Sequence, residues 1–331
     1  MSTSAAIPPA TVKIYYGYGH MHDLIIYGHV LKQVPTARKY TNNILSNIIH
    51  LLKLFFVKPL PCVKVRLHWR KQICYGKTEH DGFFKFEWVS DDPVAAGWHM
   101  VTVDALDEHD KVISSAFGQI FIPHSTQYAF ISDIDDTVMV SHSATIFRRL
   151  RALFTKNPKS RRAFEDVVSH YNLLSLSHTT QDVPNPFFYV SSSEWNLYED
   201  LVDFFQHNRL PKGTFLLSQM KRWYQLFKTG KTKHEAKLIK VYRILKVFPK
   251  QKFVLFGDNS QADPFIYEII VRKHPQSIFA VYIRNVVKKN ETVTKGLLDS
   301  IKQAGIHTCL FKTNEEAIKH SQDIGLISIN G

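Results

Sequence analysis

Residues 128–137 read YAFISDIDDT, an apolar run followed by a cluster of acidic residues. The run from Tyr128 to Ile131 predicts a buried strand. It leads into an Asp-x-Asp-x-Thr turn, which places the carboxylates of Asp133 and Asp135 at the end of that strand. Two like charges held so closely are costly to bury unless a cation or a chemical task stabilises them. In an open α/β sheet, ligands bind at the carboxyl ends of the strands, so this turn is a candidate site.

The same turn has a purely structural interpretation, in which Asp136 or Thr137 caps a following turn and takes no part in chemistry. Two later stretches favour the chemical interpretation, because each repeats a strand that ends in polar residues. Residues 187–193 read FFYVSSS, and residues 252–263 read KFVLFGDNSQAD. Their hydroxyl and carboxylate groups, together with a lysine-rich stretch between them, suit a phosphate site.

This order of motifs resembles the haloacid dehalogenase superfamily of phosphotransferases, in which Asp-x-Asp-x-Thr, a strand-Ser, a Lys and Gly-Asp-x4-Asp follow one another. Within that superfamily, the chain is similar to the phosphatidate phosphatase family typified by the yeast actin-patch protein. The resemblance covers about residues 128–290. Two departures from the family pattern are Glu194, where Pro is usual, and Ala236, where His is usual before the lysine. The stretches that carry the resemblance are SDIDDT at 132–137, YVS at 189–191 with Trp195 and Tyr198, Phe248-Pro249, FGD at 256–258 with Asp263-Pro264 and Tyr267, and YIRNV at 282–286.

The resemblance implies a catalytic role for the first two aspartates. Asp133 would attack phosphorus and form an aspartyl-phosphate, which splits hydrolysis into two steps. Asp135 would protonate the leaving alkoxide and then deprotonate the attacking water. Thr137 would steady the turn. Ser191 and a lysine would bind the phosphoryl oxygens, where charge must be stabilised in the transition state.

The phosphate lysine is expected in the basic stretch 233–247. Counting back from Phe248 by the family's spacing selects Lys237, with Lys233 as the alternative. Both lysines have a structural interpretation as solvated charges on a basic helix, and Lys240 is expected to be one in either case.

Mg²⁺ is the cofactor that the resemblance implies. Asp258 would complete an oxygen-rich shell with Asp133 and the backbone carbonyl of Asp135, and Asp263 would either ligate the ion or brace the site. All-oxygen ligands with few protein carboxylates suit Mg²⁺.

Residues 126–331 show predicted strands alternating with predicted helices, which indicates a mostly parallel sheet with helices on both faces. The expected fold is a haloacid-dehalogenase-like doubly wound sheet, with a small helical cap in the long stretch 138–186. Ser192 and Ser193 are expected to cap the helix that follows them. The predicted strands span residues 128–132, 187–190, 214–217, 253–256, 278–283 and 307–311, and the predicted helices span 194–207, 233–247, 264–273, 295–304 and 315–321.

Residues 1–125 are expected to form an antiparallel β-sandwich domain. Apolar and polar residues alternate in three runs, and two further strands are expected near the amino end. Its solvent face should be polar, and it contains no catalytic set of residues. His20 and His22 have the side chains to bind a metal, although a lone pair of loop histidines rarely does so. The five expected strands lie at 12–16, 24–31, 65–69, 84–88 and 101–105.

The formal net charge of +13 favours an anionic partner. Because no helix-turn-helix, zinc finger or aromatic RNA-binding motif is present, no nucleic acid partner is expected. Residues 43–57, which interrupt the β region, and residues 146–154 both read as amphipathic helices. Each has two interpretations, a helix packed on its own domain or a peripheral contact with anionic phospholipid.

Cys62, Cys74 and Cys309 are scattered without metal-ligand spacing, so they are expected to be reduced thiols. The first eleven residues lack a signal-peptide pattern, and no apolar run is long enough to span a bilayer. The expected location is cytoplasmic, either free or peripheral at a membrane surface.

Three functions follow from these observations. The first is a Mg²⁺-dependent phosphomonoesterase that converts phosphatidate to diacylglycerol and phosphate. The second is a phosphatase for a soluble phosphate ester, such as a nucleotide or a sugar phosphate. The third is a non-catalytic lipid- or phosphate-binding module that keeps the fold.

Overall fold

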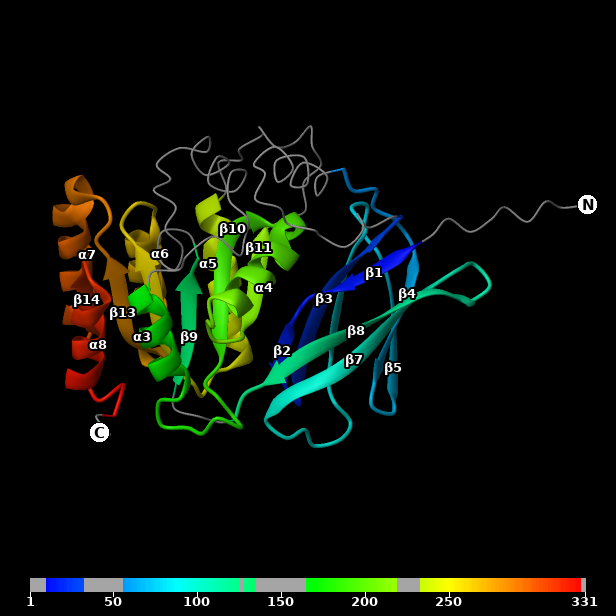
Figure 1. Ribbon diagram of the computed structural model, residues 1–331, viewed down its shortest axis with the longest axis horizontal. Helices are drawn as coiled ribbons and strands as arrows, with labels where there is room; N and C mark the ends of the chain where they lie inside the picture. The colour runs from blue at the N-terminus through cyan, green and yellow to red at the C-terminus, as the bar shows by residue number, and fades with distance from the viewer. Residues whose placement is uncertain (1–9, 33–55, 125–127, 135–164, 219–232, 329–331) are drawn as a thin grey trace, which may run out of the picture. The chain divides into compact units, whose positions relative to one another are not determined.

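The computed structural model describes residues 10–32, 56–124, 128–134, 165–218 and 233–328. These residues divide into two units, and the chain passes from the first to the second between Ile122 and Pro123. Described strands make up the first unit, whereas strands and helices alternate in the second (Figure 1).

The first unit contains eight described strands in one mixed sheet, ordered β1-β3-β2-β8-β7-β4-β5, with β6 paired to β3. All pairs are antiparallel except β2 with β8, which is parallel. The strands are β1 (Thr11–Ile14), β2 (Gly17–His20), β3 (Asp23–Leu31), β4 (Lys64–Trp69), β5 (Gln72–Lys77), β6 (Phe83–Trp88), β7 (Gly97–Leu106) and β8 (Val112–Ile122).

Alternating side chains of these strands form one hydrophobic core. In β4, Val65, Leu67 and Trp69 are buried, and their neighbours in the sequence point the other way. Alternating residues of β6 and β7 join the same core, together with residues of β3. In the three predicted runs, the apolar residues lie in this core because successive side chains of a strand point to opposite faces. The antiparallel sandwich stays a prediction at this point.

Strands β2, β5 and β8 were not expected from the sequence. β8 reads VISSAFGQIFI, in which serines and a glycine interrupt the apolar pattern. Its strand conformation comes from pairing with β7 along almost its whole length, a long-range contact that a local pattern does not contain.

The outer face of β5, β4, β7 and β8 is less polar than expected. Ile73, Tyr75, Met100 and Phe117 are each more than half exposed on it, and Phe117 reaches 76%. The expectation of a polar solvent face is wrong for these positions. It failed because two of the strands that carry them were not identified.

The second unit contains a parallel sheet of six described strands in the order β11-β10-β9-β12-β13-β14. Strand β9, the first described strand of this unit along the chain, lies between the second, β10, and the fourth, β12. The order therefore reverses between β9 and β12, where the carboxyl ends of strands leave a crevice for ligands. The strands are β9 (Tyr128–Asp133), β10 (Phe187–Glu194), β11 (Thr214–Ser218), β12 (Lys252–Asp258), β13 (Ile278–Arg284) and β14 (His307–Phe311).

Helices contact both faces of this sheet (Figure 1). Three of them contact one in-register row of side chains: Tyr171 packs on Phe256, Phe205 on Tyr189, and His320 on Tyr282. These helices are α3 (Glu165–Ser175), α4 (Tyr198–His207) and α8 (Asn314–Asp323). On the other face, Phe248 packs on Phe188 directly after α5, and α6 contacts both α5 and α7. These are α5 (Lys233–Val247), α6 (Asp263–Lys273) and α7 (Glu291–Gln303).

The helix expected from residue 194 begins later. Strand β10 continues to Glu194, and a 3-10 turn at Trp195–Leu197 precedes α4. Ser192 and Ser193 therefore lie in a strand, and the prediction that they cap a helix is wrong. The strand is longer because its pairing with β11 shifts register and resumes at Glu194 and Ser218.

Several expected features lie outside the described residues. These are residues 138–164 of the expected cap, the amphipathic stretch 146–154, and all but the last two residues of the stretch 43–57. The described remainder of 138–186 contains α3, which packs on the sheet.

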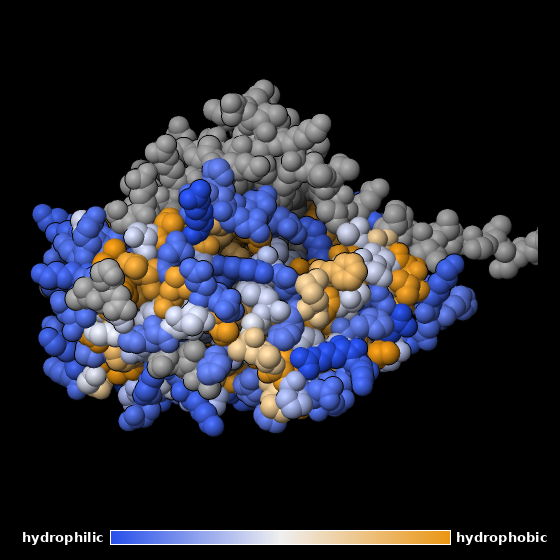
Figure 2. All heavy atoms as spheres, turned by 60° about the horizontal axis from the view of Figure 1, so that its bottom comes forward, coloured by the Kyte–Doolittle hydropathy of each residue, from blue (hydrophilic) through white to orange (hydrophobic). Residues whose placement is uncertain are grey.

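No helix within the described ranges is both long enough and apolar enough to cross a bilayer. On the face shown in Figure 2, hydrophilic side chains predominate, and hydrophobic side chains are exposed between them.

Candidate functional site

Three buried carboxylates meet at the carboxyl edge of the parallel sheet. Asp133 ends β9, Asp258 ends β12 and Asp263 begins α6. Each is at most 2% exposed. One carboxylate oxygen of each lies within 4.8 Å of the others. Because β9 and β12 are parallel neighbours, residues that lie 125 positions apart in the chain reach the same edge.

Lys237 of α5 lies against two of these carboxylates. Its Nζ donates hydrogen bonds to Asp133 Oδ1, at 2.8 Å, and to Asp263 Oδ1. Burial opposes the charged ammonium, but the two carboxylates outweigh burial and raise the pKa of Lys237 above its ordinary value. Lys237 is therefore a fixed positive charge in the site. Lys233 begins the same helix, and its side chain is outside the described residues.

Asp263 is held through both of its oxygens. Oδ1 accepts from Lys237, and Oδ2 accepts from the backbone N–H of Asp258 at 3.3 Å. The preceding residue, Gly257, allows this close packing, since a Cβ there would lie 2.5 Å from Asp263 Oδ2. The arrangement favours Asp263 as a brace for the other groups.

Asp258 presents an oxygen that fits a cation. Its Oδ1 accepts from the backbone N–H of Ser260 at 2.5 Å, whereas its buried Oδ2 has no hydrogen-bond partner among the described residues. Burial, followed by the charge of Asp263, raises the pKa of Asp258 to about 7. When all three carboxylates are ionised, they and the Lys237 ammonium together carry a net charge of −2. A divalent cation with oxygen ligands would balance that charge.

The loop that follows Asp258 is tied to the end of β13. Asn259 Oδ1 accepts from the backbone N–H groups of Val286 and Val287, each at 2.8 Å. Its Nδ2 donates to Asn285 Oδ1 at 2.7 Å. These bonds fix the loop in one conformation and so hold Asp258 at the edge of the sheet.

The backbone at Asp133 is supported from beneath by α3. Ser132 Oγ donates to the carbonyl oxygen of Asp133 at 2.7 Å and accepts from the hydroxyl of Tyr171, also at 2.7 Å. Burial raises the pKa of Tyr171, so this hydroxyl keeps its proton and remains a donor.

Ser191 lies on the neighbouring strand, one residue beyond the position paired with Asp133. It is buried, and its Oγ accepts from the backbone N–H of Ser193 at 3.0 Å. The structure thus places a hydroxyl on the strand next to Asp133. Asp135 and Thr137, the other predicted residues of the turn, lie outside the described residues.

Lys240 is not the solvated charge that was expected. Its Nζ donates to the carbonyl oxygen of Ser191 at 3.0 Å and to Ser218 Oγ at 3.4 Å. Burial, followed by the charge of Lys237, lowers the pKa of Lys240 to about 8. The sequence contained a signal for this position, because residues three apart share one face of a helix. Ala236, the departure from the family pattern, is exposed.

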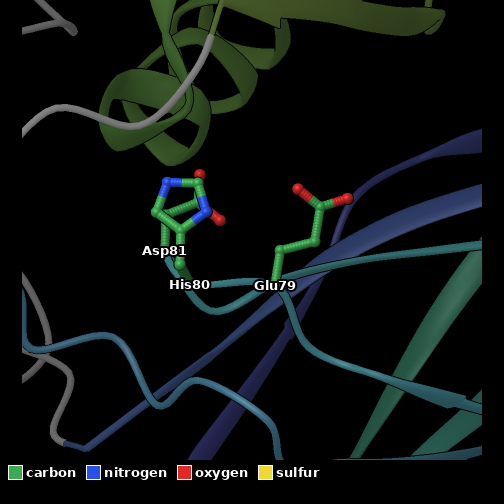
Figure 3. A group of neighbouring side chains, drawn as sticks. All are labelled: Glu79, His80 and Asp81. Atoms are coloured by element: carbon green, nitrogen blue, oxygen red, sulfur yellow. The ribbon is translucent and has the colours of Figure 1, made fainter.

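A second group in the described residues has the side chains to hold a metal. Figure 3 shows Glu79, His80 and Asp81 rising from one turn of the first unit. Glu79 and His80 are exposed, and Asp81 Oδ1 accepts from the backbone N–H of Phe83 at 3.1 Å. These contacts describe an ordinary solvated turn.

The amino-terminal histidine pair is also a local feature. His20 Nδ1 accepts from the backbone N–H of His22 at 3.1 Å, so one ring nitrogen is already engaged in the turn. Neither histidine belongs to the groups of described residues that could hold a metal.

Comparison with known proteins supports the resemblance inferred from the motifs. Residues 128–285 match the family model described as phosphatidate phosphatase APP1, catalytic domain. Over 189 residues the chain is 30% identical to phosphatidate phosphatase APP1 of Saccharomyces cerevisiae, which covers 56% of this chain and 30% of that protein. Over 202 residues it is 24% identical to the uncharacterized protein C29B5.04c of Schizosaccharomyces pombe, covering 59% and 32% respectively. The expected resemblance to the phosphatidate phosphatase family is confirmed.

The chain spans about a third of the length of the curated relatives it matches. A distant likeness is found to the solved structure of the PilB minor pilin of Streptococcus sanguinis, with a TM-score of 0.30 and 10% identity, and the match covers 80% of this chain and 87% of that one.

Proposed function

We propose that this chain is a Mg²⁺-dependent phosphatase that hydrolyses phosphatidate to diacylglycerol and phosphate. The convergence of Asp133, Asp258 and Lys237 at the carboxyl edge of the sheet carries the proposal. The match of residues 128–285 to a phosphatidate phosphatase catalytic domain supports it. The substrate is the one for which the Saccharomyces cerevisiae relative, phosphatidate phosphatase APP1, is named.

The fold assignment is part of the proposal. The strand order and the helices on both faces support a haloacid-dehalogenase-like doubly wound sheet for the second unit. In the first unit, β3 and β6 share one hydrophobic core with β4 and β7, which supports an antiparallel sandwich.

Asp133 and Asp258 would hold the Mg²⁺, together with the backbone carbonyl of Asp135. The Oδ2 of Asp258, which has no hydrogen-bond partner in the described part of the chain, and the net charge of −2 on the four ionised groups fit this assignment. When bound, the ion would neutralise the carboxylates and stabilise negative charge on the phosphoryl oxygens. Asp263 would hold Lys237 and the Asp258 backbone in place.

The reaction would proceed in two steps. The carboxylate of Asp133 attacks phosphorus, and the bond from phosphorus to the ester oxygen breaks while that oxygen takes a proton from Asp135. Water then attacks the phosphorus of the aspartyl-phosphate and gives its proton to Asp135. Phosphate leaves, and Asp133 regains its carboxylate.

Lys237 and Ser191 would stabilise charge on the phosphoryl group. The buried ammonium of Lys237 stays protonated, and Ser191 Oγ, which accepts from the backbone N–H of Ser193, lies on the strand next to Asp133. Preorganised donors of this kind act strongly where water is excluded.

A phosphate-release assay with Mg²⁺ tests the proposal on phosphatidate vesicles and on soluble esters such as nucleotides and sugar phosphates. Wild type should release phosphate from phosphatidate, and Asp133→Asn should lose at least about 10³-fold in rate, as expected when a nucleophile is removed. Asp299→Asn is the matched control, because Asp299 is exposed on α7, and it should keep wild-type activity.

The same assay separates the other two functions. Turnover of soluble esters without turnover of phosphatidate, and without sedimentation on anionic vesicles, identifies a soluble-ester phosphatase. Equal phosphate release by wild type and Asp133→Asn contradicts the proposed mechanism. A complete lack of turnover on every ester, with intact binding of vesicles or phosphate, identifies a binding module.

A further inference from the structure

We infer that Lys240 is a second cation of the phosphate site, which positions Ser191 and selects phosphomonoester dianions over singly charged phosphodiesters. The inference rests on the proposed function, and it adds a residue and a substrate class to it. No motif of the family resemblance assigns a role to Lys240.

The geometry places two ammonium groups side by side along α5. Lys237 and Lys240 are three residues apart, so they lie on neighbouring positions of one helical face. Lys237 reaches Asp133 at the end of β9, and Lys240 reaches Ser191 at the end of β10. Since β9 and β10 are adjacent and in register there, both ammonium groups face the same edge of the sheet.

Lys240 also joins the ends of two strands. Its Nζ donates to the carbonyl of Ser191 on β10 and to the hydroxyl of Ser218, the last residue of β11. Ser191 is thus held through its carbonyl by Lys240 and through its Oγ by the Ser193 N–H. This fixes the backbone that carries the hydroxyl proposed to bind phosphate.

The charges around Lys240 explain why it would recognise a dianion. Burial is the largest effect that opposes the positive charge of Lys240, and Lys237 adds to it, whereas Asp133 and Glu194 favour the charge. The ammonium of Lys240 is therefore incompletely compensated by the described groups. A doubly charged phosphoryl group would stabilise the ammonium of Lys240 more than a singly charged diester would.

Lys240 would hold its proton below about pH 8 and lose it above that pH. The guanidinium of an arginine in its place would stay charged over the whole range. Its contribution to phosphate binding would therefore fall as the pH rises through about 8. Lys237 would keep its proton over this range, because two carboxylates raise its pKa.

The experiment compares Lys240→Met and Lys240→Arg with wild type and with Lys246→Met. Lys246 lies on the same helix and is exposed, so its variant is the matched control. The first readout is kcat/KM for a phosphomonoester and a phosphodiester between pH 6.5 and 9.5. The second is the thermal shift that inorganic phosphate causes in the presence of Mg²⁺, which requires no turnover.

Lys240→Met should lower kcat/KM for the monoester by about 10- to 100-fold, the loss expected for a charge-assisted hydrogen bond. Selectivity for monoester over diester should fall with it. The decrease in wild-type kcat/KM above about pH 8 should disappear in both variants, and Lys240→Arg should recover activity at high pH. The shift caused by phosphate should shrink in Lys240→Met alone.

If wild type is active and Lys240→Met has the same pH profile, selectivity and phosphate shift as wild type, the inference is overturned and the proposed function stands. If wild type is inactive but its phosphate shift depends on Lys240, the anion site is supported and the proposed phosphatase activity is contradicted. Absence of both activity and a phosphate shift in wild type would overturn both.

Discussion

Replacing Lys237 by Met should destabilise the second unit strongly. The side chain of Lys237 is 12% exposed, and those of Asp133 and Asp263 are 3% and 1% exposed. Methionine keeps most of the stem but leaves two buried carboxylates without their ammonium. Breaking a buried ion pair by removing one partner costs about 3–5 kcal/mol. For a unit of this size that corresponds to a decrease of about 6–20 °C in Tm.

The pH at which this loss should appear follows from the pKa of Lys237, which is raised in the folded protein. A raised lysine pKa gives stability that is fully present below the unfolded value of 10.5 and is lost as the pH rises through the folded value. The full effect should therefore be seen at pH 7.5.

Differential scanning calorimetry of the full chain in EDTA measures the effect, with Lys246→Met as the control for an exposed lysine on the same helix. The double variant Lys237→Met/Asp263→Asn should recover part of the loss, because it removes one of the two uncompensated charges. A decrease in Tm of less than about 2 °C for Lys237→Met would refute the reasoning, since it would correspond to less than about 1 kcal/mol.

Three further predictions follow from the buried groups. In EDTA, the protein should lose stability as the pH rises from about 4 to about 7, because the raised pKa of Asp258 makes the folded state bind a proton that the unfolded state has released; Asp258→Asn should flatten this part of a urea-unfolding profile. Gly257→Ala should lower the free energy of unfolding by about 1–3 kcal/mol, because the added Cβ forces Asp263 away. Calorimetric titration with Mg²⁺ should show weaker binding to this variant, and wild-type values for both quantities would contradict the close packing of Gly257 on Asp263. The first unit should lose about 2 kcal/mol between pH 7.5 and pH 5, because burial lowers the pKa of His29 to about 4 and its neutral form is required when folded; unfolding of His29→Leu should not show this loss.

The secondary structure of the second unit was predictable because its strands are short apolar runs that end in polar residues. The predicted strand at 278–283 and the predicted helix at 233–247, for example, correspond closely to β13 and α5. Buried parallel strands have this continuous apolar character, and the helices between them have a 3.6-residue period. The positions of Asp133 and Asp258 at strand ends were also evident from that pattern.

The contacts within the site were less predictable, because they depend on how helices pack. The spacing from Lys237 places Lys240 on the same helical face, but only the docking of α5 brings it to Ser191. Ser192 and Ser193 have ideal helix-capping side chains, but the pairing of β10 with β11 keeps them in a strand. In the first unit, β5 and β8 owe their conformation to partner strands, so their exposed Ile73 and Phe117 were not anticipated.

The strand order has a consequence for synthesis of the protein. Strand β9 leaves the ribosome long before β12, its partner on one side, while β10 and β11 add only to the other side. Until residues 252–256 are made, the backbone N–H and C=O groups along one edge of β9 have no strand to bind, and an unpaired edge invites association with other chains. A chain truncated before β12 should therefore aggregate as well as lack Asp258.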